Sequence, residues 1–256
     1  MTMAGTTPGK LHPVAKWSLI IGPVLIVVFN FLMPVNGFSP IDPEDTGAYI
    51  TALGADADIA QVYILIILLG VVLFTRGIIG LWQATPTGSV ARQRLTVGLL
   101  GTVAALGLWG VVLGLGLAEA SVAKNVVDAT AAAGAGVAGM AEKAASATLI
   151  ATTLHAGYFG VFQVTTFVAF IALIPLGGGI AVSGIVRKEF GWLIIAIGVV
   201  TVIVTSVMPV KTEAGSMAFG IIALVWGLTF LVMGLQILRQ DMNESRASTV
   251  STDSTE

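Results

Sequence analysis

Six long apolar runs without an acidic residue divide this chain, and they constrain its fold more than any other feature. An α-helix needs about 20 apolar residues to cross the hydrocarbon core of a bilayer. Hydrophobic residues make up 56% of the chain and charged residues only 10%, whereas a soluble domain carries about 25% charged residues. The sequence therefore predicts an all-α integral membrane protein, a bundle of six helices.

The limits of the apolar runs define the predicted topology. The spans lie at about residues 17–34, 59–83, 95–117, 147–174, 192–209 and 217–238. We expect an N-terminal tail at 1–16 and structured outer loops at 35–58 and 118–146. The Ser- and Thr-rich tail at 239–256 has alternating charge signs and is predicted to be disordered. Pro175 and the three glycines that follow it are expected to end the fourth span.

The twelve cationic residues are distributed unevenly between the gaps. Nine lie in or beside the two tails and the odd-numbered gaps: Lys10, Lys16, Arg76, Arg92, Arg94, Arg187, Lys188, Arg239 and Arg246. Only Lys124, Lys143 and Lys211 lie in even-numbered gaps. Positive charge is retained on the cytoplasmic side of membranes. We therefore expect both termini in the cytoplasm, and a multi-pass protein of a bacterial or archaeal cytoplasmic membrane.

The two outer loops are long enough to carry structure. In the first, Asp42 is expected to cap a short helix that Gly54 ends. In the second, a helix along the outer surface is expected to lead into a flexible connection rich in Ala and Gly. Glu119 counts among the acids of this second loop, so no carboxylate is assigned to the membrane interior. That distribution argues against a proton-coupled pump.

Glycines recur at intervals of seven, or of three and four, inside several spans. Membrane helices associate through small residues that let backbones approach closely. The predicted packing positions are Gly107, Gly110 and Gly114 in the third span, Gly191 and Gly198 in the fifth, and Gly220, Gly227 and Gly234 in the sixth. The spacing does not distinguish packing within one chain from a homo-oligomer contact.

Arg76 and His155 are the ionisable candidates inside the spans, where such groups are costly and often functional. Arg76 lies about two turns from the inner end of its helix. It either extends to the interface as an anchor or faces a water-filled cavity and binds an anionic group. His155 is either a neutral imidazole hydrogen-bonded to a neighbouring helix, or a residue for ligand binding, proton transfer or metal binding.

Asn30 and Gln163 complete the predicted polar set, and interhelical hydrogen bonding is the default role of each. The chain has no cysteine and only two histidines, and His12 falls on the other side of the membrane from His155. No site for a metal or cofactor is therefore predicted. No Ser-His-Asp set or phosphate-binding loop is present, and no basic patch suits nucleic acid.

The segment Leu154-His155-Ala156-Gly157-Tyr158 precedes a long apolar stretch, a basic turn at 187–188, Gly191 at the start of a span and Pro209 at its end. With these features the chain resembles a family of uncharacterised bacterial membrane proteins with six transmembrane helices. The resemblance covers residues from about 14 to 238 and implies the same fold. The family has no assigned activity, and the long Ala/Gly loop departs from it.

Three functions remain open at this point. The first is a non-enzymatic accessory or scaffold subunit of a membrane assembly, with the lipid bilayer and a partner subunit or homo-oligomer around it. The second is a binder or transporter of a small or lipid-like molecule, which requires Arg76 and His155 to line one cavity. The third is a membrane enzyme that uses His155, which requires a second polar residue within hydrogen-bonding reach of it near the outer surface.

Overall fold

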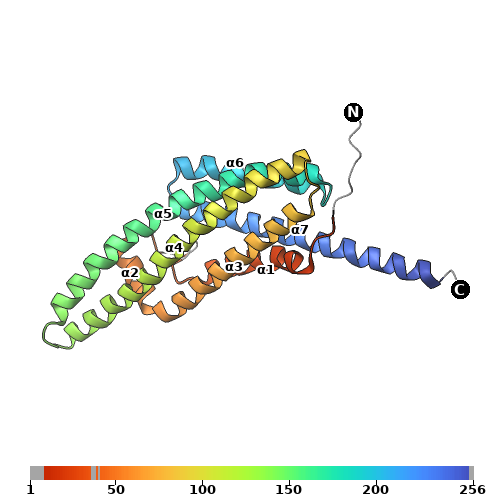
Figure 1. The fold of residues 1–256 in the computed structure, drawn as a ribbon. Coiled ribbons are helices and arrows are strands. Elements are labelled where there is room, and N and C mark those ends of the chain that lie inside the picture. The colour runs from red at the N-terminus through yellow and green to blue at the C-terminus, as the bar shows by residue number, and fades with distance from the viewer. Residues whose placement is uncertain (1–8, 36–38, 40, 254–256) are drawn as a thin grey trace.

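The computed structural model describes residues 9–35, 39 and 41–253, and this part of the chain is helical without a strand (Figure 1). The helices are α1 (Pro13–Leu32), α2 (Thr46–Ala55), α3 (Ala57–Ala84), α4 (Val90–Gly134), α5 (Met140–Ser183), α6 (Lys188–Val207) and α7 (Glu213–Asp253). All except α2 are long and apolar enough to span a membrane. The protein is thus an all-α, multi-pass membrane protein, as the apolar runs predict.

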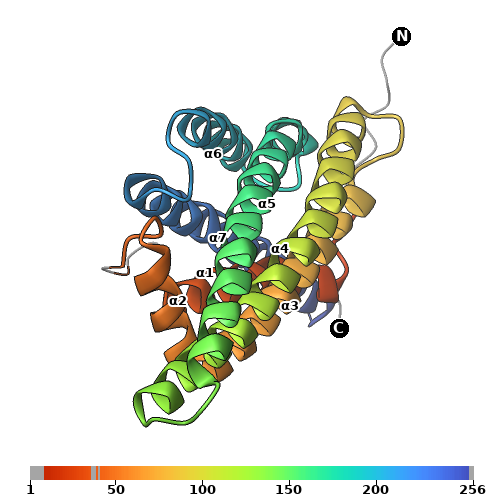
Figure 2. The ribbon, with the colours of Figure 1, turned by 90° about the vertical axis from the view of Figure 1, so that its left-hand side faces the viewer.

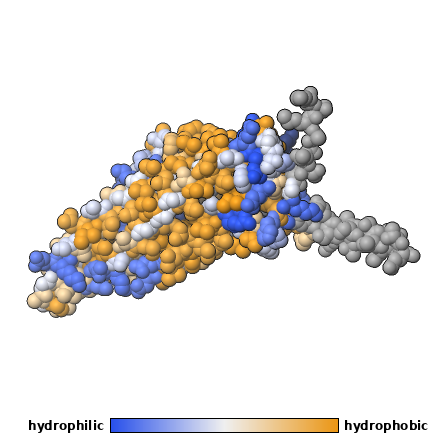
Figure 3. Space-filling model, viewed as in Figure 1, coloured by the Kyte–Doolittle hydropathy of each residue, from blue (hydrophilic) through white to orange (hydrophobic). Residues whose placement is uncertain are grey.

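The bundle is elongated, and its two ends differ (Figures 1 and 2). The start of α1, the turns at 85–89 and 184–187, and the last turns of α7 lie at one end, which we call the termini end. Helix α2 and the tip of the α4–α5 hairpin lie at the other, the hairpin end. An apolar surface covers the middle of the molecule, and hydrophilic residues gather towards both ends (Figure 3). This distribution matches a bilayer crossed along the long axis.

The second outer loop differs from its prediction. Residues 118–134 do not form a separate surface helix but continue α4, and α5 begins at Met140, so that the two helices form a long hairpin. The cause is local, because no Gly or Pro interrupts the Ala-rich stretch from 117 to 133. Gly134 is the last residue of α4, and Gly136 and Gly139 lie in the short turn between the helices, where they adopt φ angles of 79° and 76°, which glycine reaches without strain.

Two further helix ends lie beyond their predicted positions. Helix α5 continues through Pro175 and the following glycines to Ser183, and Pro is tolerated in membrane helices that have close neighbours. Helix α7 runs to Asp253 instead of giving way to a disordered tail at 239. No Gly or Pro follows Gly234 in the chain, so nothing in its sequence stops the helix from propagating out of the apolar span.

Close backbone contacts hold together the half of the bundle nearer the termini end, which we call the termini half; the other half is the hairpin half. A Cβ atom on Gly22 of α1 would lie 2.5 Å from the Phe74 nitrogen of α3, and one on Gly177 of α5 would lie 2.6 Å from the Gly191 oxygen of α6. A Cβ atom on Gly98 of α4 would lie 2.7 Å from the backbone of Leu176 on α5. Any side chain at these glycines would push two helices apart.

The predicted packing glycines fall into three groups. Gly191 and Gly198 lie against the backbone of α5, and Gly227 and Gly234 lie against Val27 and Ile20 of α1. Gly220 lines a cavity instead. Gly107, Gly110 and Gly114 do not pack against another helix, since outside their own helical turns no described atom lies within 4 Å of a Cβ built on any of them. They lie on the exposed face of α4, and Gly98 and Gly101, on the opposite side, make its close contacts with α5.

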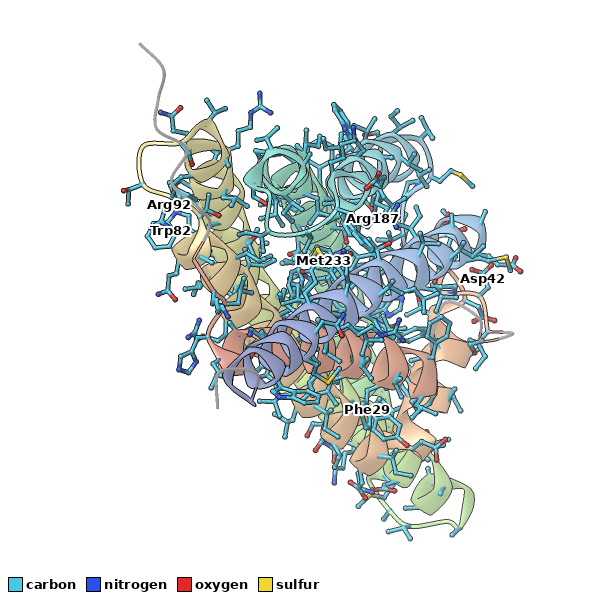
Figure 4. All side chains as sticks on the ribbon, turned by 90° about the vertical axis from the view of Figure 1, so that its right-hand side faces the viewer. Phe29, Asp42, Trp82, Arg92, Arg187 and Met233 are labelled. Carbon is cyan, nitrogen blue, oxygen red and sulfur yellow. The ribbon has the colours of Figure 1, made fainter. Side chains whose placement is uncertain are left out.

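The turn between α3 and α4 is fastened by Arg92, whose side chain lies beside Trp82 (Figure 4). The guanidinium carbon is 3.5 Å from the centroid of the Trp82 ring. The same group donates hydrogen bonds to the carbonyl oxygens of Trp82 and Thr85 at the end of α3, the second at 3.0 Å. The last carbonyls of a helix lack the N–H groups of a further turn. The Thr85 nitrogen donates to the Trp82 carbonyl at 3.3 Å, and Arg92 adds its hydrogen bonds to close the end of α3.

Candidate functional site

A buried pair of ionisable side chains lies in the hairpin half of the molecule. Nδ1 of His155, on α5, is 2.8 Å from Oε1 of Glu119, on α4. The other ring nitrogen, Nε2, is 3.0 Å from the carbonyl oxygen of Pro43, in the loop that leads into α2. Glu119 is only 1% exposed and His155 only 6%. One imidazole ring therefore connects two membrane helices and the first outer loop.

Helix α2 covers this pair because small residues let it approach closely. A Cβ on Gly54 would lie 2.7 Å from the carbonyl carbon of Ala123 on α4. Tyr49, Ile50 and Leu53 of α2 pack in one cluster with Ala120, Ala123 and Ala151 of the hairpin. The cap of α2 is Asp45, which accepts from the Ala48 nitrogen at 3.0 Å. Asp42, the predicted cap, instead accepts from the Glu44 nitrogen one turn earlier.

Aromatic rings enclose the imidazole. The Tyr49 ring meets the His155 ring edge to face at 4.5 Å between centroids, and Phe159 meets it at 4.8 Å. Burial raises the pKa of Tyr49 well above its usual value, and the neighbouring Tyr158 and Glu119 add to the shift. The Tyr49 hydroxyl therefore stays protonated and neutral at physiological pH, where it is able to donate a hydrogen bond.

A series of voids leads from this cluster to the middle of the bundle. A void of about 50 Å³ is lined by Glu119, Tyr49 and Tyr158, and a neighbouring one of about 60 Å³ shares both tyrosines with it. Asn30 lines these two voids and also a larger, apolar cavity of about 100 Å³ deeper in the bundle. The walls of the deep cavity include Phe74, Ala105, Trp109, Phe170, Phe219 and Trp226.

On the side of the imidazole away from the interior voids lies an open groove of about 540 Å³, lined by residues of the loop before α2, α5 and the turn between α6 and α7. We call it the outer groove, after the predicted outer loop that lines it. His155 and Pro43 form part of its wall, and Glu44 and Lys211 bring opposite charges to it. Pro43 and Phe159 line both this groove and the void of about 60 Å³. The hydrogen-bonded unit of Glu119, His155 and Pro43 thus separates the groove from the interior voids.

Arg76 and His155, the two predicted ionisable candidates, do not line one cavity. Arg76 lies in the termini half of α3, in none of the walls described above. Its side chain is half-buried, and Nη1 lies 3.8 Å from the position that a Cβ of Gly80, one turn nearer the helix end, would occupy. Nη1 has no hydrogen-bond partner among the described residues. A transport route through both residues is therefore not supported.

Gln163 and Asn30, the other predicted candidates, have different surroundings. The Gln163 amide donates to the Thr205 carbonyl oxygen and accepts from the Val210 nitrogen at 2.9 Å. Gln163 therefore joins α5 to the end of α6 through the interhelical hydrogen bonding that the sequence predicts. It also lines the outer groove. Asn30 remains half-buried where the voids meet. Its side chain is a polar group available to a molecule in the deep cavity.

Glu119 is the residue that the sequence assigned to the wrong environment. The sequence pattern predicts that it lies in the second outer loop, whereas in the structure it is buried against His155, 36 positions away in the chain. A signal was present, because Val112, Gly116, Glu119 and Ala123 follow helical spacings of three and four and lie on one buried stripe. Extending the third helix beyond Leu117 places the carboxylate on that stripe.

The fold and the site together define a multi-pass membrane protein with a buried carboxylate–imidazole pair beside an internal cavity. Comparison with known protein families, curated proteins and solved structures gives no match for the chain. The resemblance to the uncharacterised six-helix family therefore stays a prediction. Within the described residues no three His, Asp or Glu side chains are placed to hold a metal ion.

Proposed function

We propose that this membrane protein binds a small, mostly apolar molecule in the interior cavity and admits it from the side of the outer groove. The observation that carries the proposal is the series of voids that runs from the apolar cavity past Asn30 to the cluster of Glu119, Tyr49 and Tyr158. Ligand sites are concave and mostly apolar, with a few polar groups that fix orientation. The interior of this bundle matches that description.

The polar groups suggest the chemical class of the ligand. Tyr49, Tyr158 and Asn30, whose side chains carry hydrogen-bond donors, line the void at one end of the apolar chamber. Among the residues that line the deep cavity, none is charged. A neutral molecule with one hydroxyl or carbonyl group on an apolar body fits best. An apolar cavity of about 150 Å³ holds benzene, so the deep cavity suits a group somewhat smaller than that ring unless side chains move.

Photolabelling tests this function. The probe is (3-methyl-3H-diazirin-3-yl)methanol, an aliphatic molecule that has no aromatic ring, is neutral and carries one hydroxyl group. We expect it to label the peptides that contain Trp109 and Phe219 in the wild-type protein. Ala105→Phe fills the cavity and is expected to reduce this labelling at least tenfold. Ala104→Phe is the matched control, because Ala104 is exposed on the same helix.

Equal labelling of the two variants, or labelling confined to exposed faces, would contradict the proposed function. Mass spectrometry of an organic extract of the purified protein gives an independent reading. A small molecule that co-purifies with the wild type and with Ala104→Phe, and is lost from Ala105→Phe, identifies the natural ligand.

An accessory or scaffold role is the second candidate, and the hairpin favours it. The tip of the α4–α5 hairpin projects past the rest of the bundle (Figure 1), and most of its residues from 130 to 146 are exposed. A projecting hairpin is able to reach a partner subunit. Purification in a mild detergent tests this role: a stoichiometric partner that is lost when residues 127–143 are replaced by a short Gly/Ser turn supports it, and a monomer without partners counts against it.

An enzymatic role remains the third, untested prediction. Glu119 supplies the second polar residue that this role requires within reach of His155. Both ring nitrogens of His155 are already engaged, however, so the imidazole would have to leave one partner before it could exchange a proton with a substrate.

The orientation of the protein in the membrane likewise stays a proposal. The cation pattern supports a cytoplasmic termini end, which directs the outer groove away from the cytoplasm.

A further inference from the structure

The contacts of His155 determine how many protons the pair with Glu119 must hold. The carbonyl oxygen of Pro43 accepts only, so the Nε2 atom that faces it must carry a proton. The contact of Nδ1 with Oε1 of Glu119 needs a second proton, located on either atom. The pair is therefore an imidazolium with a carboxylate, or a neutral imidazole with a carboxylic acid. Both forms have no net charge, which suits a buried site.

Removal of one proton leaves one donor for two acceptors. The remaining proton then serves either the Glu119 carboxylate, through Nδ1, or the Pro43 carbonyl, through Nε2. A hydrogen bond to an ionised group is about twice as strong as one between neutral groups. The carboxylate therefore keeps the donor, and the lone pair of Nε2 faces the lone pairs of the carbonyl oxygen. The contact between the loop and α5 becomes repulsive.

Other ionisable groups near His155 come from every element that surrounds it. Tyr49 of α2 stays neutral because burial raises its pKa, and Tyr158 of α5 lies beside Glu119 in the same void wall. Glu44 of the first outer loop and Lys211 of the α6–α7 turn line the groove and are exposed to water. Their opposite charges are screened there, whereas a net charge on the buried pair is not.

We propose that the loss of one proton from the Glu119–His155 pair releases the Pro43 carbonyl and opens the outer groove to the interior voids. Pro43 and Phe159 form the wall between the two spaces, so a displacement of the loop joins them. We call the hydrogen-bonded unit of Glu119, His155 and Pro43 the latch. The latch is closed, with both hydrogen bonds of His155 formed, at low pH, and it opens as the pH rises. Its regulatory meaning rests on the proposed function, because what it controls is access of the ligand to the interior cavity.

Cysteine labelling tests the latch directly, because the chain contains no cysteine. Leu113→Cys places a thiol in the wall of the interior void beside Glu119. Ser121→Cys places an exposed reference thiol on the same helix. N-ethylmaleimide is the reagent, and the ratio of the two labelling rates removes the intrinsic effect of pH on thiols. We expect this ratio to rise at least tenfold between pH 5 and pH 8.5 in detergent-purified protein.

Glu119→Gln provides the decisive variant. The amide of Gln donates to Nδ1 of a neutral imidazole, which leaves the Nε2 proton for Pro43, so both contacts persist without a titrating carboxyl group. The labelling ratio is then expected to stay low and independent of pH. Glu44→Gln, which removes an exposed carboxylate from the same loop, is expected to keep the wild-type response. Gly116→Cys, whose Cβ fits beside Ile64 and Tyr158 at 3.4 Å, is a second inner reporter in case Leu113→Cys does not fold.

A flat ratio in the wild-type background overturns the latch, and so does an unchanged pH response in Glu119→Gln. These outcomes are distinct from failure of the proposed function, since the labelling requires no ligand. A pH-dependent ratio together with no photolabelling of the cavity would retain the latch and remove the ligand. Photolabelling of the cavity with the same yield at both pH values, together with a flat ratio, would retain the ligand and remove the latch.

Discussion

The two halves of this bundle are built by different means. In the termini half, glycines bring helix backbones into contact, as at Gly22 against Phe74 and Gly177 against Gly191. In the hairpin half, Gly54 also approaches the Ala123 backbone closely, but voids lie between the other helices, and aromatic rings and one buried carboxylate make the contacts around these voids. Backbone contact leaves no room for movement, whereas voids and a single hydrogen-bonded ring do. We therefore expect the termini half to resist movement more than the hairpin half, which holds the buried carboxylate–imidazole pair and the voids beside it.

The largest effect is expected in the termini half, from a side chain at Gly191. A Cβ there would lie 2.5 Å from the Gly177 oxygen, so Gly191→Leu forces α6 away from α5. Overpacking of this kind costs up to about 3 kcal/mol, and more where backbone must move. Equilibrium unfolding in mixed SDS and dodecylmaltoside micelles measures this loss. Gly107→Leu is the control, with a change within about 1 kcal/mol because no described atom opposes its Cβ.

The comparison would fail if both glycine variants lost the same stability. That result would mean that Gly107 packs against something as closely as Gly191 does, and the outward face of α4 would then be a contact surface for a second subunit. Unfolding measured over a range of protein concentrations would reveal such a surface.

In the hairpin half, removal of the buried carboxylate is expected to cost less. Glu119→Ala leaves Nδ1 of His155 without a partner in a buried site, at a cost of about 1–3 kcal/mol. Glu119→Gln keeps a donor for that nitrogen and is expected to stay within about 1 kcal/mol of the wild type. The same unfolding assay compares the two. An equal loss in both variants would indicate that the carboxylate charge, rather than the hydrogen bond, stabilises the site.

The packing of α2 against α4 gives a local test of how the hairpin half is held together. Gly54→Leu places a side chain against the Ala123 backbone and is expected to lift α2 without unfolding the bundle. Amide hydrogen exchange over residues 46–55 should accelerate at least about tenfold, which corresponds to 1.4 kcal/mol of local stability. Gly47→Leu, on the exposed side of α2, should leave exchange nearly unchanged. A global loss of protection in Gly54→Leu would show that α2 supports the whole bundle.

Much of the architecture follows from patterns in the sequence, and the site follows only in part. Apolar runs predict the spans, and the position of His155 inside one of them places it among the candidates. The distribution of Lys and Arg predicts the orientation, which stays a prediction. The partner of His155 was missed because Glu119 lies just beyond the apolar run, where composition indicates a loop. Periodicity singles out Gly107, Gly110 and Gly114 of α4, but Gly98 and Gly101, which the pattern does not single out, make the close contacts. That choice depends on tertiary packing.

The smallest of these effects is expected from Arg92, and it tests whether side chains matter in the termini half at all. Arg92 covers Trp82 and donates to two carbonyl oxygens at the end of α3. The group is only partly buried, so its loss in Arg92→Ala should cost about 1 kcal/mol. Arg92→Lys keeps the positive charge but not the planar guanidinium group, and its free energy of unfolding should fall by about half as much. Arg94→Ala, an exposed neighbour with one long contact of 3.4 Å, should unfold as the wild type does. A loss in Arg92→Ala as large as that in Gly191→Leu would mean that the α3–α4 turn, and not helix contact, limits the stability of this end.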